Sequence, residues 1–280
     1  MSVIIKEILN AIKEHIIFAC TLFILFVLGV ILIVTRFEGP AFSVLDPIQS
    51  GNPYNYTLFG LSLVTLILLL SIAFFLLNRY LKTEKENFYQ LVWGLAFLFY
   101  SWTFVGLIFR SIGLDFGGLL PLESTTTGFF IWRQGMIFWA TFVWIGLSSL
   151  LTDRKEIQYI PAAVIFAVSE IWFVIGLLLM PTIFGIEATM YGFLFLVFVP
   201  NVWTLAYLWY LFSKKSNLTS GYVLMAGFVW LGFTYVMWAP WHYSHLVYIY
   251  FVWFCLFVLS LAIILLGMVM LPLESQAQQT

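Results

Sequence analysis

The sequence predicts an all-α fold, a polytopic transmembrane bundle of about eight helices with both termini cytoplasmic. The chain is 63% hydrophobic and 9% charged, and its apolar residues form long runs separated by short polar breaks. A helix needs about 20 apolar residues to cross a hydrocarbon core of roughly 30 Å, and backbone polar groups in lipid must pair within the helix. We therefore expect one membrane-spanning helix for each run: 16–36, 56–78, 89–110, 128–151, 158–181, 190–213, 219–240 and 246–271.

The distribution of charge predicts the orientation. When the eight runs are threaded in order, Arg36, Arg110 and Arg133 fall near the face opposite the N terminus. Cytoplasmic loops of membrane proteins carry an excess of Lys and Arg. We therefore expect both termini to be cytoplasmic. We also expect the protein to be located in a prokaryotic cell membrane. The side that holds the N terminus carries the other nine of the twelve Lys and Arg residues, namely Lys6, Lys13, Arg79, Lys82, Lys85, Arg154, Lys155, Lys214 and Lys215.

Three segments divide the chain. Residues 1–14 alternate apolar and polar positions with a helical period, which predicts an amphipathic helix lying in the membrane interface, or a helical extension of the first span. Residues 15–272 form the predicted transmembrane bundle, and residues 273–280 form a polar tail. The eight predicted spans use most of the 280 residues, so we expect no separate soluble domain.

Glu170 is the sharpest candidate for a functional residue, because it lies about midway along the run 158–181. A charged carboxyl inside the membrane costs several kcal/mol, so it is expected to be protonated or paired. One interpretation is a proton-relay or ligand-binding carboxyl. The other is a neutral carboxyl that forms a hydrogen bond with a neighbouring helix.

Asn201 is a second candidate, next to Pro200 near the middle of the run 190–213. The proline removes a backbone donor and kinks the helix, and Asn201 can both donate and accept. A short loop joins this run to the run that carries Glu170, which predicts antiparallel neighbours. Glu170 and Asn201 then meet at similar depth, or the two remain independent packing features.

Arg133 and Gln134 lie about one and a half turns inside the run 128–151. The arginine can extend outward along its stem to the interface. It can also face the bundle interior and pair with Glu170, Asp115 or Glu123. We favour the interior-facing role, and count Glu170, Asn201, Arg133 and Gln134 as the candidate ligand or proton site.

Metal and cofactor sites find little support in the sequence. His242 and His245 have a spacing that allows one metal ion between them, but no third ligand is apparent, so a polar turn is the favoured interpretation. The spans contain no lysine for a retinal Schiff base and no histidine pair suited to haem. We therefore expect no cofactor. Cys20 and Cys255 lie in apolar runs and are interpreted as buried thiols.

One stretch resembles a known family. Residues 132–139, Trp-Arg-Gln-Gly-Met-Ile-Phe-Trp, are similar to the third helix of microbial rhodopsins in placing an arginine in the outer half, followed by aromatics. Residues 238–241 add an aromatic-proline stretch. The run 248–270 lacks the lysine of that family, and Met136 stands where a carboxylate is expected. The resemblance therefore implies a shared bundle shape without the pigment.

The motif pattern favours a non-enzymatic protein. The sequence contains no phosphate-binding glycine loop, no zinc-binding spacing, no nucleophile elbow and no basic surface for nucleic acid. We expect a sensor- or receptor-like bundle, or an accessory subunit of a membrane complex, with an aromatic-lined cavity between helices. Its expected partners are the lipid bilayer and other membrane subunits or further copies of itself. The alternative is a proton-coupled transporter, or a quinone-interacting anchor of a redox complex, that uses Glu170.

Overall fold

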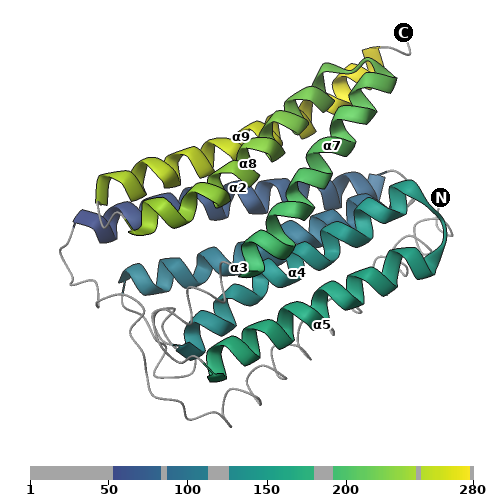
Figure 1. Cartoon of the computed structure of the whole chain (residues 1–280). Helices are drawn as coiled ribbons and strands as arrows, with labels where there is room; N and C mark the ends of the chain where they lie inside the picture. Colours follow the sequence, from purple (N-terminus) through teal and green to yellow (C-terminus); the bar gives the residue numbers. More distant parts are fainter. Residues whose placement is uncertain (1–52, 83–86, 113–125, 180–191, 244–246, 278–280) are drawn as a thin grey trace, which may run out of the picture.

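The computed structural model describes residues 53–82, 87–112, 126–179, 192–243 and 247–277 (Figure 1). Every secondary-structure element in these ranges is a helix, so the predicted all-α class is confirmed for this part of the chain. The elements are α2 (Pro53–Lys82), α3 (Phe88–Ile112), α4 (Thr126–Leu151), α5 (Lys155–Leu179), the π-helical η2 (Leu194–Phe198), α7 (Val199–Ser216), α8 (Thr219–Tyr243) and α9 (Val247–Ala277).

Six helical stretches in the described ranges are long and apolar enough to cross a membrane, which indicates an integral membrane protein. They lie in α2, α3, α5, η2 with α7, α8 and α9. The remaining helix, α4, contains the polar pair Arg133 and Gln134, and its 26 residues extend over roughly 39 Å. The predicted span 16–36 and amphipathic helix 1–14 lie outside the described residues. Eight spans and two cytoplasmic termini therefore stay predictions.

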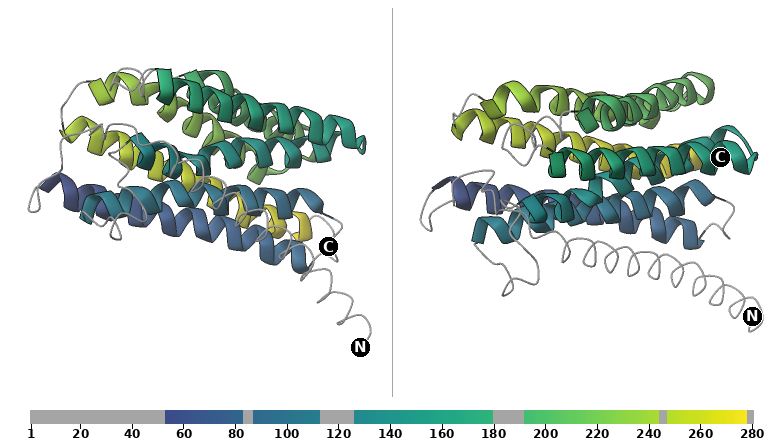
Figure 2. Two further views of the ribbon diagram at one scale, coloured as in Figure 1. Left: turned by 90° about the horizontal axis from the view of Figure 1, so that it is seen from below. Right: turned by 60° about the horizontal axis from the view of Figure 1, so that its bottom comes forward.

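The helices form a ring, with α5 attached to its outside (Figure 1). In the ring, α3 packs between α2 and α4, α9 joins α2 to α8, and α8 packs along α7. Contacts of α4 with η2 and α7 close the ring. The helix α5 packs along α4 at the edge of the bundle, and two further views show the helices running in roughly one common direction (Figure 2).

The expectation that α5 and α7 are neighbours along their lengths is wrong. Helix α5 packs on α4, whereas α7 packs on α8. The two residues before η2 contact α5. The rings of Phe173 and Phe193 lie 5.4 Å apart, and the ring of Trp172 lies against Gly192. From that contact α7 diverges across α4 toward α8 (Figure 1). A short connection brings two helix ends together, but side-chain packing decides which helices run side by side.

Aromatic rings fill the centre of the ring of helices. The ring of Phe198, from η2, lies 5.8 Å from Tyr100, 4.5 Å from Trp139 and 4.5 Å from Tyr235. These residues come from α3, α4 and α8, so one aromatic cluster joins four elements. Such pairs contribute about 0.5–1.5 kcal/mol each beyond the area they bury. The centre of the bundle is therefore an aromatic core.

The helix that contains Pro200 is irregular where the sequence predicts a kink. The five residues before Val199 are π-helical, and the N–H of Val199 donates to the carbonyl oxygen of Leu194. Proline has no N–H, so one carbonyl oxygen of the preceding turn lacks its usual donor. A π-helical turn beside a proline is one of the established causes of a bent helix. The sequence predicted an irregularity near Pro200 and missed its π-helical form.

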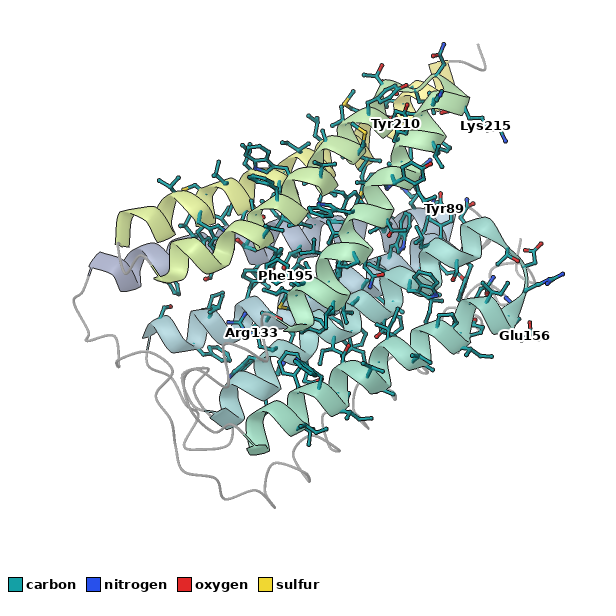
Figure 3. All side chains as sticks on the ribbon, viewed as in Figure 1. Tyr89, Arg133, Glu156, Phe195, Tyr210 and Lys215 are labelled. Carbon is teal, nitrogen blue, oxygen red and sulfur yellow. The ribbon has the colours of Figure 1, made fainter. Side chains whose placement is uncertain are left out.

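Charged side chains gather at one end of the bundle. Figure 3 shows Glu156 and Lys215 at this end, with Arg133 away from it. This grouping follows from the alternation of helix directions, and it agrees with the charge pattern that predicts a cytoplasmic face. The described basic residues of this end are Arg79, Lys82, Arg154, Lys155, Lys214 and Lys215.

Candidate functional site: a carboxyl and an amide between two helices

The site is a hydrogen-bonded pair of side chains between α4 and α5. Nε2 of Gln134 donates to Oε2 of Glu170 across 3.3 Å. Gln134 is 1% exposed and Glu170 is half-buried. The carboxyl of Glu170 therefore faces a neighbouring helix, and its partner is an amide.

The α4–α5 turn sets the register of this pair. The N–H of Thr152 donates to the carbonyl oxygen of Ser148 at 3.0 Å, and Nε2 of Gln158 donates to the carbonyl oxygen of Thr152 at 2.6 Å. Gln134 and Glu170 each lie 18 residues from Thr152, on opposite sides of the turn. In an antiparallel hairpin, equal spacing brings two residues to the same level, here roughly 27 Å from the turn. The pair thus lies at one common level of α4 and α5, far from the turn that joins them.

The pair has more acceptors than donors. Oε1 of Gln134 and Oε1 of Glu170 are both buried, and neither has a hydrogen-bond partner within the described part of the chain. A buried acceptor without a donor costs about 1–3 kcal/mol. A proton on the carboxyl, or a bound molecule that carries hydrogen-bond donors, supplies what the site lacks. The arrangement is therefore suited to binding a proton or a donor-bearing ligand.

Arg133 precedes Gln134 on α4, and its side chain is half-buried. The side chains of consecutive helical residues point about 100° apart around the axis. Because Gln134 points toward α5, Arg133 points in a different direction. The hydrogen bond to Glu170 comes from Gln134, and not from Arg133, for which Glu170 was one of three possible partners. The other expected partners of Arg133, Asp115 and Glu123, lie outside the described residues.

Asn201 is 7% exposed and contacts α4 at a different point. Its Nδ2 lies 3.5 Å from the carbonyl oxygen of Ala140, which makes a long hydrogen bond between α7 and α4. Ala140 lies six residues beyond Gln134 on α4, or roughly 9 Å along the helix. Of the two open interpretations, the structure shows separate partners for Glu170 and Asn201. Asn201 acts as a packing contact that helps to close the ring.

The histidine pair lies outside the part of the chain whose side chains are described. His242 belongs to α8, but nothing is described of its side chain, and His245 falls in the gap before α9. Among the described residues, no group of three or more His, Cys, Asp and Glu side chains is placed to hold a metal ion.

Sequence reasoning missed a pair of polar atoms in the aromatic core. The hydroxyl of Tyr100 and Nε1 of Trp139 are buried and have no hydrogen-bond partner in the described ranges. Their rings lie 5.8 Å apart. Both residues lie in sequence runs rich in aromatic residues, so nothing in the sequence distinguishes them from their neighbours as unpaired polar groups. The core therefore contains two further unmet polar groups.

Comparison with known proteins adds nothing to this geometry, because no family model, no curated protein and no solved structure matches the chain.

Proposed function

We propose that this chain is a non-enzymatic polytopic membrane protein, a sensor- or receptor-like bundle or an accessory subunit of a membrane complex, and that the Gln134–Glu170 pair is its responsive site. The single observation behind the proposal is the surplus of acceptors in this pair. A buried polar site that lacks a donor gains a hydrogen bond when a proton or ligand arrives. Binding then changes the free energy that joins α4 to α5.

The position of α5 supports a response of this kind. Helix α5 packs along α4 at the edge of the bundle, and its outer face is apolar and exposed, at Ile160, Val164, Val168, Ile171 and Ile175. An edge helix has fewer contacts to break when it shifts than a helix inside the ring. A ligand shifts a conformational equilibrium by the difference between its affinities for the two states. The α4–α5 contact therefore supplies both a binding site and a movable element.

The remaining polar groups favour this class over a transporter. A transporter lines a continuous route with polar side chains. Here many hydroxyls bond to a carbonyl oxygen three or four residues earlier in their own helix, which satisfies them locally. Examples are Thr65, Ser101, Thr141, Ser148, Ser169 and Thr204.

A second candidate function uses the same carboxyl. Oε1 of Glu170 is buried and without a donor, so it can accept a proton in transit. A proton-coupled transporter, or a quinone-interacting anchor of a redox complex, would use Glu170 in that way. This candidate differs from the first by one measurable property, the net movement of protons across the membrane.

Purified protein in liposomes that contain a pH-sensitive dye separates the two candidates. After a step in external pH, tryptophan emission and internal pH are followed for the wild type and Glu170→Gln. The proposal expects a reversible emission change that requires Glu170, and the same internal pH trace for both proteins. Proton entry that Glu170→Gln abolishes supports the second candidate and contradicts the first. An unchanged emission response in Glu170→Gln contradicts the first candidate, and an unchanged internal pH trace contradicts the second.

A further inference from the structure

The end of the α7–α8 hairpin is a rigid, exposed turn. Helix α7 ends at Ser216 and is capped by Asn217, which has φ 59° and donates from its N–H to the carbonyl oxygen of Ser213 at 2.8 Å. The hydroxyl of Ser213 is buried and donates to the carbonyl oxygen of Leu218. These bonds fix the last turn of α7, which carries Lys214 and Lys215 (Figure 3).

The two lysines are cationic groups without a local counter-charge. Both are exposed, and neither forms a hydrogen bond or ion pair with any residue that the structure describes. The hairpin from Val199 to Tyr243 contains no Asp or Glu. Glu274 of α9 reaches it, but Oε2 of Glu274 accepts the N–H of Ser220 at 2.8 Å at the start of α8. The helix end therefore already compensates that carboxylate.

The α4–α5 turn at the same end of the bundle provides a contrast. Its adjacent cations Arg154 and Lys155 are flanked by Asp153 and Glu156, so these four residues carry no net charge. Nζ of Lys155 also donates to Oε1 of Gln158 at 3.3 Å, and it lies 5.9 Å from the rings of Phe88 and Tyr159. Of these two turns, the α7–α8 turn alone carries an excess of positive charge.

Exposed tyrosines lie just inside the lysines. Tyr207, Tyr210 and Tyr222 form what we call the tyrosine patch, and they are 59%, 37% and 40% exposed. The ring of Tyr210 lies 6.4 Å from Tyr207 and 6.4 Å from Tyr222. Tyrosines on the outside of membrane proteins gather at headgroup level, with the ring in the apolar layer and the hydroxyl in the polar layer. The patch therefore marks the depth at which headgroups meet this hairpin.

We propose that the α7–α8 hairpin binds the headgroups of anionic phospholipids, with Lys214 and Lys215 contacting the phosphates and the tyrosine patch supporting the glycerol region. Lysines at a membrane surface extend along their stems to reach headgroups. Charge complementarity selects anionic over zwitterionic lipid, since each lysine near an anionic surface contributes about 1 kcal/mol. The occupant is a lipid rather than a soluble acidic protein, because the tyrosines beside the lysines lie on an apolar helix face.

Native mass spectrometry of the full chain, taken from nanodiscs of phosphatidylcholine with phosphatidylglycerol, measures retained lipid. Wild type is compared with Lys214→Gln/Lys215→Gln and with the matched control Arg154→Gln/Lys155→Gln. The preference for phosphatidylglycerol should fall on the order of fivefold per lysine removed from the hairpin. The control should keep its preference. Tyr210→Phe removes only a hydroxyl. It should weaken the preference for phosphatidylglycerol by less than the loss expected for the removal of one lysine.

Two outcomes overturn the proposal. The first is an equal loss in both double variants, or no preference in the wild type, because the hairpin would then be no more than part of a general charge effect. The second is displacement of the retained lipid by inorganic phosphate at equal concentration, because the site would then recognise a free anion. Equal unfolding midpoints of the four proteins in phosphatidylcholine alone exclude misfolding as the cause of a loss.

Discussion

Gly135 of α4 lies directly against the backbone carbonyl of Phe99 of α3. A Cβ at this glycine would overlap the carbonyl oxygen of Phe99 and lie 2.7 Å from Oγ1 of Thr103. Small residues at such crossings let two membrane helices approach closely. The neighbouring residue on α4, Gln134, faces α5. Helix α4 is therefore fixed to α3 at the level where it carries the polar site.

Gly135→Ala should lower the free energy of unfolding by about 1–3 kcal/mol, because the clash involves backbone and cannot be relieved by rotating a side chain. Gly60→Ala is the control. A Cβ at Gly60 meets nothing within 4 Å, and alanine is the better helix former by about 1 kcal/mol. Unfolding in mixed micelles measures both. Equal effects at the two glycines would show that α3 and α4 do not approach closely.

The Gln134–Glu170 hydrogen bond should give non-additive losses in a double-mutant cycle. Gln134→Leu and Glu170→Leu should each destabilise by about 1–3 kcal/mol, because each leaves a buried polar partner unpaired. The double variant removes both polar groups at similar volume, and it should be more stable than either single variant. Unfolding of the four proteins under one condition measures the coupling. Simple addition of the two losses would mean that the side chains do not interact.

The helical runs were predictable from sequence, because the length of an apolar segment that crosses a membrane is fixed by the thickness of the bilayer. The run 246–271 matches α9, yet α9 continues to Ala277. Hydropathy reports the apolar layer, and a helix can extend past it. The prediction that Glu170 has a partner depended on the free-energy cost of an isolated carboxyl in the membrane. It did not require knowing which residues lie near Glu170.

The identity of that partner was beyond the sequence. Asn201 and Arg133 were considered as partners of Glu170, whereas Gln134 was counted in the candidate site without being assigned to Glu170. Which residues meet depends on helix rotation and register, which packing sets in three dimensions. Gln134 and Glu170 are equally far from Thr152 in the sequence, which predicts that they lie at the same level. This prediction can be made only when the position of the turn is known. The π-helical form of η2 has no sequence signature beyond the nearby proline.

The orientation of the bundle can be tested by cysteine labelling. In a background with Cys20 and Cys255 replaced, Lys214→Cys and Lys155→Cys should react with an impermeant reagent from one side of the membrane. Gln49→Cys, which lies outside the described residues and between the predicted spans 16–36 and 56–78, should react from the other side. Intact cells and inverted vesicles provide the two sides. Reaction of all three positions from one side would contradict the predicted eight spans.

Infrared difference spectroscopy tests the central claim most directly, because it reads the carboxyl of Glu170 itself. Spectra are recorded between two pH values for the wild type, Glu170→Gln and Gln134→Leu in lipid. A responsive Glu170 predicts a carboxylic C=O band in the wild type that is absent in Glu170→Gln. The same band should be displaced in Gln134→Leu, because the Nε2 donor 3.3 Å from Oε2 is lost. A band that persists in Glu170→Gln, or that is unmoved in Gln134→Leu, would contradict the claim that this pair is the responsive site.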